Sequence, residues 1–141
     1  MVIENLVSVM IKQHRELQKD LATAKSLSVA TEMDTKEIFF QLELFKHNLI
    51  EHLKLENGTF YSDLIRKMKE KGVDTTKTEL FINEMNVIAQ AVTGFLDNYD
   101  SEEKIRHAPE VFINDLEGII RALNIRIESE EAGVYSYWGL F

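Results

Sequence analysis

Residues 52–62 read HLKLENGTFYS, and residues 126–136 read RIESEEAGVYS, with Glu, Tyr and Ser at matching positions of the two stretches. The stretches lie 74 residues apart, and the same offset pairs Leu42 with Leu116. This internal repeat indicates that the chain is built from two similar halves.

Each stretch lies at the end of a helical pattern of apolar residues. Before the first stretch, apolar residues recur at intervals of four, three and four at Ile38, Leu42, Phe45 and Leu49. Before the second, a similar series runs through Phe112, Leu116, Ile119 and Leu123. Such intervals are typical of the buried seam of a helical bundle. Continued along the chain, the two series reach His52 with Glu56 and Arg126 with Glu130, so polar pairs are expected in the bundle interior.

Four helices account for nearly all of the chain, which has one Pro, six Gly and no strand-like alternation of apolar residues. The apolar patterns predict helices over about residues 3–28 and 35–70, a third from Thr76 and a fourth from Pro109. Short connections between helices imply antiparallel neighbours. The prediction is one all-α domain over residues 1–141, an up-down-up-down antiparallel four-helix bundle made of two similar helical hairpins.

Local signals support these helix boundaries. Gly72 is predicted to end the second helix as a C-cap, and Thr76 with Glu79 to form a capping box that starts the third. The charged residues 98–107 are expected to form a connection that contains a helical turn. Pro109 is well placed for the first turn of the fourth helix.

The composition restricts the possible partners. A formal net charge of −8 argues against nucleic acid or an anionic membrane surface, so cations or proteins are the expected partners. The absence of Cys means that any metal must be bound by His and carboxylates. No apolar run approaches the ~20 residues of a membrane span, and no signal peptide is recognised. We therefore expect a cytoplasmic protein.

The polar residues on the predicted seams fall in one layer. His14 interrupts the apolar stripe of the first helix, and an offset of 71 residues between the first and third helices places Met85 opposite it. The other members of the layer are His52, Glu56, Arg126 and Glu130. Because residues four apart share a helix face, His52 and Glu56 can offer an imidazole and a carboxylate to one metal ion.

On these residues the chain resembles the hemerythrin-like, or HHE cation-binding, family over essentially its whole length. The resemblance depends on His14 early in the first helix and on His52 and Glu56 in the second. It also depends on the residues that follow these ligands, which are Asn57, Phe60-Tyr61, Glu130-Glu131 and Tyr135.

The resemblance implies a four-helix bundle that binds iron. Members of the family hold two irons, and the residues of this chain that match their metal ligands are His14, His52, Glu56 and Glu130. At two further ligand positions, where the family has His on the third and fourth helices, this chain has Met85 and Arg126. One metal or none is therefore expected in place of a complete diiron centre.

Two interpretations of the incomplete site remain open. In the first, one metal such as iron, zinc or manganese is bound, and the protein is a sensor or a binding protein for oxygen or another small ligand. In the second, Arg126 pairs with Glu56 and Glu130 and replaces the metal charge. The chain would then be a metal-free regulatory bundle that binds a protein, similar to the bacterial bundles that sequester the housekeeping sigma factor. An inward Arg126 favours the second interpretation, and an outward one favours the first.

The remaining features have simpler interpretations. His47 and Glu51 repeat the His-x-x-x-Glu spacing, but His47 lies about 140° around the helix from His52 and is expected at the surface. His107 is expected to be solvated. The aromatic tail, residues 133–141, is expected to fold over the bundle end or to dock on a partner or a second copy. No catalytic constellation is recognised, so an enzyme is not expected.

Overall fold

The computed structural model describes residues 3–141, with side chains described from Leu6 on. Met1 and Val2, the first residues of the predicted domain, lie outside the described part. Within residues 3–141 no helix is both long and apolar enough to span a bilayer. Every regular element there is helical, in the order α1 (Ile3–Ser28), α2 (Thr35–Leu55), the π-helix η1 (Glu56–Tyr61), α3 (Ser62–Glu70), α4 (Thr76–Asn98), α5 (Glu102–His107), α6 (Pro109–Ala132) and α7 (Val134–Tyr137).

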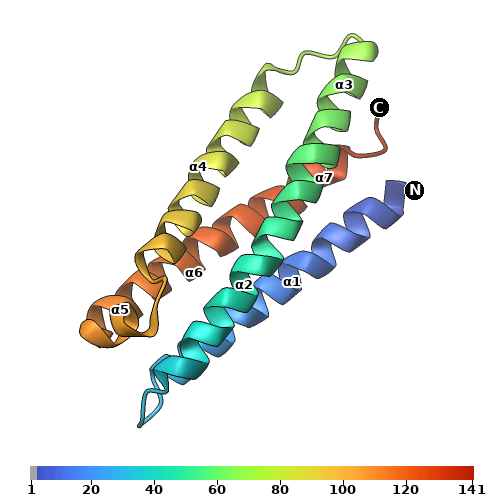
Figure 1. Cartoon of the computed structure of the whole chain (residues 1–141). Coiled ribbons are helices and arrows are strands. Elements are labelled where there is room, and N and C mark those ends of the chain that lie inside the picture. The colour runs from blue at the N-terminus through green and yellow to red at the C-terminus, as the bar shows by residue number, and fades with distance from the viewer. Residues whose placement is uncertain (1–2) are drawn as a thin grey trace.

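Four long rods form a bundle (Figure 1). The first rod is α1, the second is the unbroken succession of α2, η1 and α3, and the third and fourth are α4 and α6. Consecutive rods run in opposite directions, which confirms the predicted all-α, up-down-up-down architecture. The short helix α5 lies in the connection between α4 and α6, where the sequence predicts a helical turn.

Local interactions define the end of the second rod and the start of α4. Gly72 has a φ of 70°, and the backbone hydrogen bonds of a Schellman cap close α3 there, as predicted. The predicted capping box of Thr76 and Glu79 is wrong, because Thr76 is already helical and Thr75 is the N-cap. The Thr75 hydroxyl donates to the Glu79 carboxylate instead, at 2.9 Å.

Two hydrophobic clusters form the core, one on each side of the predicted polar layer. The larger cluster contains buried residues such as Leu17, Leu49 and Leu123. The smaller cluster contains residues such as Met10, Phe60 and Val134. In the first, second and fourth rods, the polar seam residues come between the members of the two clusters. A buried polar layer therefore crosses the bundle between two apolar regions.

The C-terminal tail covers one end of the bundle. Trp138 stacks on Phe60 of the second rod, with ring centroids 4.9 Å apart, and Lys67 Nζ lies 4.3 Å from the centre of the Trp138 ring. Tyr135 also packs on Phe60, with centroids 5.1 Å apart. The tail thus folds over the bundle end, the first of the two predicted arrangements, and brings Tyr135 into the polar layer.

Candidate metal centre

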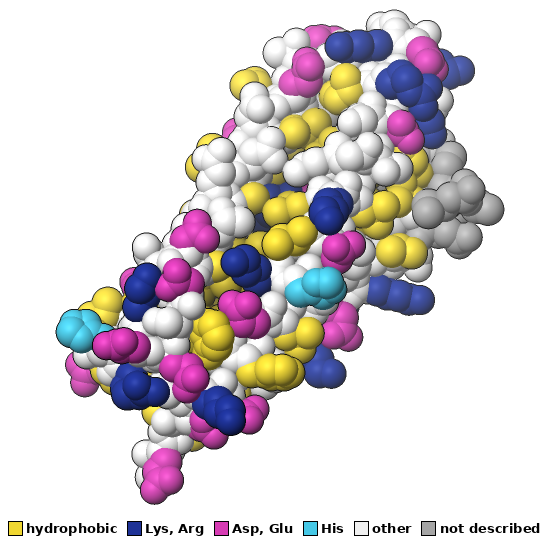
Figure 2. Space-filling view, in the orientation of Figure 1, with side chains coloured by type: hydrophobic (Ala, Val, Ile, Leu, Met, Phe, Trp, Pro, Cys, Tyr) yellow, Lys and Arg dark blue, Asp and Glu magenta, His cyan; other side chains and the backbone are white. Residues whose placement is uncertain are grey.

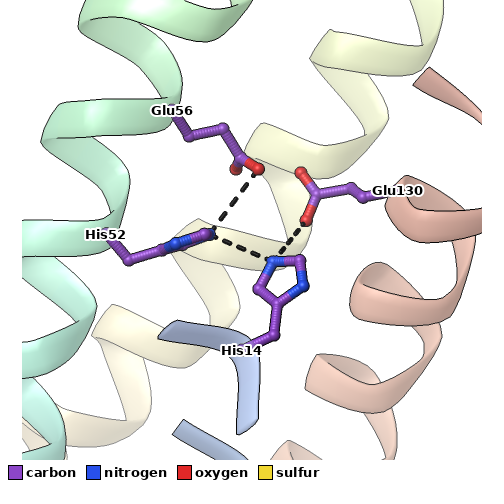
Figure 3. A group of neighbouring side chains, drawn as sticks. All are labelled: His14, His52, Glu56 and Glu130. Carbon is purple, nitrogen blue, oxygen red and sulfur yellow. Dashed lines mark hydrogen bonds and ion pairs between the residues drawn. The ribbon is translucent and has the colours of Figure 1, made fainter. Parts of the chain in front are cut away.

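Four ligand-type side chains meet in the polar layer and form the candidate centre (Figure 3). His14 comes from α1, His52 from α2, Glu56 from the first residue of η1 and Glu130 from α6. Each is at most 2% exposed, and one ligand atom from each lies within 4.8 Å of the others. The fold therefore brings together all four residues that the sequence analysis selected as metal ligands.

The two imidazole rings face each other at the middle of the centre. Their Nε2 atoms are 3.2 Å apart. His14 Nε2 lies 3.4 Å from Glu130 Oε1, and His52 Nε2 lies 3.6 Å from Glu56 Oε2. Each imidazole thus has one carboxylate beside it, and the donor atoms surround a common point.

Hydrogen bonds at the opposite ring nitrogens determine which nitrogen faces this point. His14 Nδ1 lies 2.7 Å from Glu131 Oε2, and His52 Nδ1 lies 2.7 Å from Gln13 Oε1. Both partner oxygens accept hydrogen bonds, so we assign the ring proton of each neutral imidazole to Nδ1. When the ring is neutral, each Nε2 then presents a lone pair to the centre, as metal-binding histidines do when an outer acceptor orients them.

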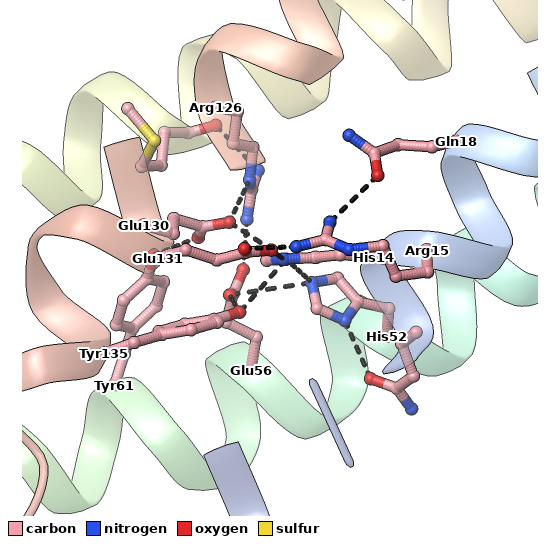
Figure 4. Close-up of polar contacts among 12 residues, drawn as sticks. His14, Arg15, Gln18, His52, Glu56, Tyr61, Arg126, Glu130, Glu131 and Tyr135 are labelled. Carbon is pink, nitrogen blue, oxygen red and sulfur yellow. Dashed lines mark hydrogen bonds and ion pairs between the residues drawn. The ribbon is translucent and has the colours of Figure 1, made fainter. Parts of the chain in front are cut away.

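Arg126 also points into the centre (Figure 4). Its Nη2 donates to Glu56 Oε1, its Nε donates to Glu130 Oε1 at 3.4 Å, and its Nη1 donates to the backbone carbonyl of Met85 at 2.8 Å. This inward bridge between two carboxylates is the orientation that favours the metal-free interpretation. However, Arg126 contacts Glu56 through Oε1 alone, and Glu56 Oε2 remains on the side of His52.

The charged groups of the centre shift one another's pKa values. Burial alone would raise the pKa of Glu56, but the neighbouring His52 and the charge of Arg126 hold it well below its usual range. Burial raises the pKa of Glu130, and the neighbouring His14 and the charge of Arg126 offset only part of this rise. Burial would lower the pKa of Arg126, but the two carboxylates raise it, so the guanidinium stays charged.

Two tyrosines complete the hydrogen bonding of the carboxylates. Tyr61 donates to Glu130 Oε2, and Tyr135 donates to Glu56 Oε2 at 2.6 Å. Tyr135 Oη also lies 3.1 Å from His14 Nε2. Burial and the charges of both carboxylates raise the pKa of each phenol, which keeps both hydroxyls protonated. Each tyrosine therefore acts as a hydrogen-bond donor to the carboxylate of the other half of the repeat.

The inward position of Tyr61 depends on the π-helix η1. In a regular α-helix a residue five positions after Glu56 lies about 140° around the axis, so Tyr61 would face away from the centre. The turns of a π-helix are wider, with hydrogen bonds between residues five apart, and Glu56 and Tyr61 are the first and last residues of η1. The predicted helix over residues 35–70 is therefore correct in extent, but it is not regular throughout.

The three remaining residues considered in the sequence lie where they were expected, with Met85 inside the bundle and His47 and His107 at the surface. Met85 is buried, and the group of metal-ligand side chains does not include it. Its contribution to the centre is the backbone carbonyl that Arg126 binds. His47 and His107 are both exposed.

Sequence reasoning assigned no role to four residues that orient the ligands, which are Gln13, Tyr61, Glu131 and Tyr135. The tyrosines have a signal in the sequence, because a Glu is followed five residues later by a Tyr in both halves of the repeat. Glu131 is one of the residues on which the family resemblance depends, whereas Gln13 has no sequence signal. Each is merely adjacent in sequence to a ligand, and its contact with the opposite rod depends on the packing of the bundle.

The donor set fits a divalent metal ion. Two imidazole nitrogens and two carboxylates suit iron, zinc and manganese. Two nitrogens bound to one ion at about 2.1 Å are roughly 3.0 to 3.4 Å apart when the angle at the ion is octahedral to tetrahedral. The observed Nε2 separation of 3.2 Å lies within this range. When both carboxylates are ionised, Arg126 balances one of their two negative charges, so a further cation would also balance the centre electrically.

A family model described as the hemerythrin HHE cation binding domain matches residues 5–138 of the chain. The matched range contains all four ligand-type residues of the centre, together with Arg126. No curated protein and no solved structure shows a significant match to the chain.

Proposed function

The chain belongs to the hemerythrin HHE cation-binding domain family, and from this membership we propose that it is a metal-binding protein whose centre holds one ion instead of two. The proposed ligands are His14, His52, Glu56 and Glu130. Iron is the proposed metal, because the family resemblance implies it and because this mixture of imidazoles and carboxylates suits Fe(II).

The observation that carries the proposal is the pair of facing Nε2 atoms. They are 3.2 Å apart, and both Nδ1 atoms are committed to acceptors on Glu131 and Gln13. Two lone pairs directed at one point inside a protein repel each other unless a proton or a metal ion lies between them. A metal ion at this point would satisfy both nitrogens and would also stabilise the ionised form of Glu130, whose pKa is raised by burial.

The position of Arg126 favours a centre with one bound ion over a centre with two. It stands at the position where the family has a His on the fourth helix, and its guanidinium binds both carboxylates from that position. A buried Arg is stable only when carboxylates pair with it. We infer that Arg126 supplies permanently the charge of a second cation, while the two imidazoles serve the first.

We further propose that the protein is a sensor or an oxygen-linked or small-ligand binding protein, and not an enzyme. Iron held by four protein ligands would supply an open coordination position for a small molecule. Tyr61, Tyr135 and Arg126 would hold the two carboxylates in fixed orientations around that position. Their role in this proposal is to position ligands, and none of them takes part in a chemical step.

The inward Arg126 favours a second candidate function, a metal-free bundle that binds a protein partner. In that case the guanidinium alone would neutralise the buried carboxylates, and a proton would lie between the two imidazoles. The formal net charge of −8 offers an acidic surface to a basic partner. This candidate differs from the first in one measurable quantity, the metal content of the purified protein.

Elemental analysis of protein produced in iron-supplemented cells and purified without oxygen tests the proposal. The wild-type chain is expected to contain about one metal ion per chain, and His52→Ala is expected to lose it because an Nε2 ligand is removed. His47→Ala is the matched control. His47 lies on the same helix and is also followed four residues later by Glu, but it is exposed, so its metal content should equal that of the wild type.

Metal-free protein in all three preparations would contradict the metal-binding proposal and direct attention to protein partners. Equal metal content in wild type and His52→Ala would mean that the ion is bound elsewhere on the chain. Two ions in the wild type would contradict the role given to Arg126.

A further inference from the structure

The buried centre raises the question of how an ion reaches it. Contacts between α1 and α6 close one side of the centre. Arg15 pairs with Glu131, and Gln18 donates to Asn124 Oδ1 at 3.0 Å. The tail closes the end of the bundle, where Trp138 is 7% exposed. The side between the second rod and α4 contains a groove.

A groove of about 760 Å³ lies between the second rod and α4, and it is called the access groove here. Asn57 and Ser62 line it from the second rod, and Asn83 and Asn86 line it from α4. Figure 2 shows this face of the molecule, with hydrophobic side chains visible in the furrow between α4 and the second rod. The deepest lining residue is Tyr61, which is 4% exposed.

Tyr61 connects the access groove to the centre. Its ring lines the groove, and its hydroxyl donates to Glu130 Oε2. Three other grooves are lined by residues that form no hydrogen bond or ion pair with the four ligand side chains. Of these four grooves, the access groove is therefore the one with a lining residue that is hydrogen-bonded to a ligand side chain.

The lining of the access groove suits a hydrated divalent cation. The described residues that line it include no Lys or Arg, and their polar groups are amides, hydroxyls and the Glu79 carboxylate. Oxygen atoms of this kind bind hydrated divalent cations weakly, as an ion in transit requires. The net negative charge of the chain also attracts cations to its surface.

We propose that the access groove is the path by which a divalent cation reaches the centre, passing Tyr61. This inference depends on the proposed metal-binding function. It assigns the amide side chains of Asn83 and Asn86 to the outer part of the path. Rotation of the Tyr61 ring breaks one hydrogen bond and exposes Glu130 Oε2, the first oxygen of the centre that an incoming ion meets.

Zn²⁺ binding and release by the full chain test the path. Asn83→Trp and Ser62→Trp place a large ring in the access groove from opposite walls, at exposed positions where folding should be unaffected. Each is expected to slow both Zn²⁺ association and chelator-induced release by about tenfold or more, with Kd unchanged. The two rates fall together because a blocked path alters neither the free nor the bound state.

Asn114→Trp is the matched control, since Asn114 is an exposed residue of the separate groove between α4 and α6. Its rates should equal those of the wild type. Unchanged rates in Asn83→Trp and Ser62→Trp, with wild-type Zn²⁺ stoichiometry, would overturn the path but leave the proposed function intact. Equal slowing in Asn114→Trp would also overturn it. A wild-type chain that takes up no Zn²⁺ would overturn the path and the proposed function together.

Discussion

Arg126 is the residue that determines how much positive charge the centre has in the absence of metal. Its guanidinium binds Glu56, Glu130 and the Met85 carbonyl, so its hydrogen-bonding groups are directed at the centre from the α6 side. Removal of such a cation leaves two buried carboxylates facing each other, which costs about 3–5 kcal/mol. The same removal also vacates the space that a second ion would need.

The double variant Met85→His with Arg126→His tests this account at the level of residues. It restores His at the two positions where the family has further ligands, so metal stoichiometry is expected to rise from one ion to two per chain. Without metal, the free energy of unfolding should fall by about 3–5 kcal/mol because the fixed cation is lost. Elemental analysis and urea unfolding in the presence of a chelator measure the two effects.

Arg126→Lys is a suitable comparison, because it keeps the charge but lacks the fork that spans two carboxylates. Its stoichiometry should stay at one. If the double variant also bound a single ion, Arg126 would not be what prevents the second.

Among the helical elements, η1 has the largest effect on the site. In a regular helix Leu64 would lie about 120° around the axis from His52, whereas with one residue fewer it would lie within about 20°. Both side chains are buried in the structure. The π-helix therefore accommodates one extra residue and keeps α3 in phase with α2.

Deletion of Gly58 is expected to convert η1 into a regular α-helix without loss of the fold. Gly58 is exposed, and a Cβ placed on it would meet no atom within 4 Å, so its removal breaks no packing. Tyr61 would then follow Glu56 by four positions, a spacing that keeps both on one helix face. Circular dichroism and cooperative thermal unfolding like those of the wild type are the expected results.

The opposite change provides the contrast. Insertion of one Ala after Gly58 would rotate Leu64 and Met68 about 100° out of the core, and it should destabilise the fold severely. If the deletion and insertion variants were equally stable, the idea that η1 accommodates one extra residue in the second rod would be wrong.

At the scale of the whole molecule, the polar layer links metal binding to stability. The ligands come from three of the four rods, so an ion at the centre binds the folded state and not the unfolded chain. At Zn²⁺ concentrations about a hundredfold above Kd, the added stability is about 2.7 kcal/mol. For a domain of this size the melting temperature should rise by roughly 10 °C.

Thermal unfolding with and without Zn²⁺ measures this rise, with His52→Ala as the control. The variant should show little or no rise, because it lacks one of the two central nitrogens. A rise of equal size in both proteins would locate Zn²⁺ binding outside the centre.

The fold was predictable from sequence because its determinants are local. Apolar residues repeat at helical intervals, and Gly72 and Pro109 stand at helix boundaries, so the four rods and their order follow from neighbouring residues. The ligand group was predictable because His52 and Glu56 share one helix face. The orientation of Arg126 was not, since it depends on a carboxylate and a carbonyl supplied by other rods. The π-helix was missed because its extra residue shifts the phase of the apolar pattern only after Glu56, beyond the series from Ile38 to Leu49 that defined the helix.

The buried guanidinium has a consequence for the protein during metal starvation. A centre built on two exchangeable ions loses all of its positive charge when iron is scarce, and its carboxylates then repel one another. Here one of the two positive charges belongs to the Arg126 side chain, so a chelator or a low iron concentration cannot remove it. Under the one-ion proposal, the chain stays folded when iron is lacking. Iron binding then changes the occupancy of the centre and is not required for folding.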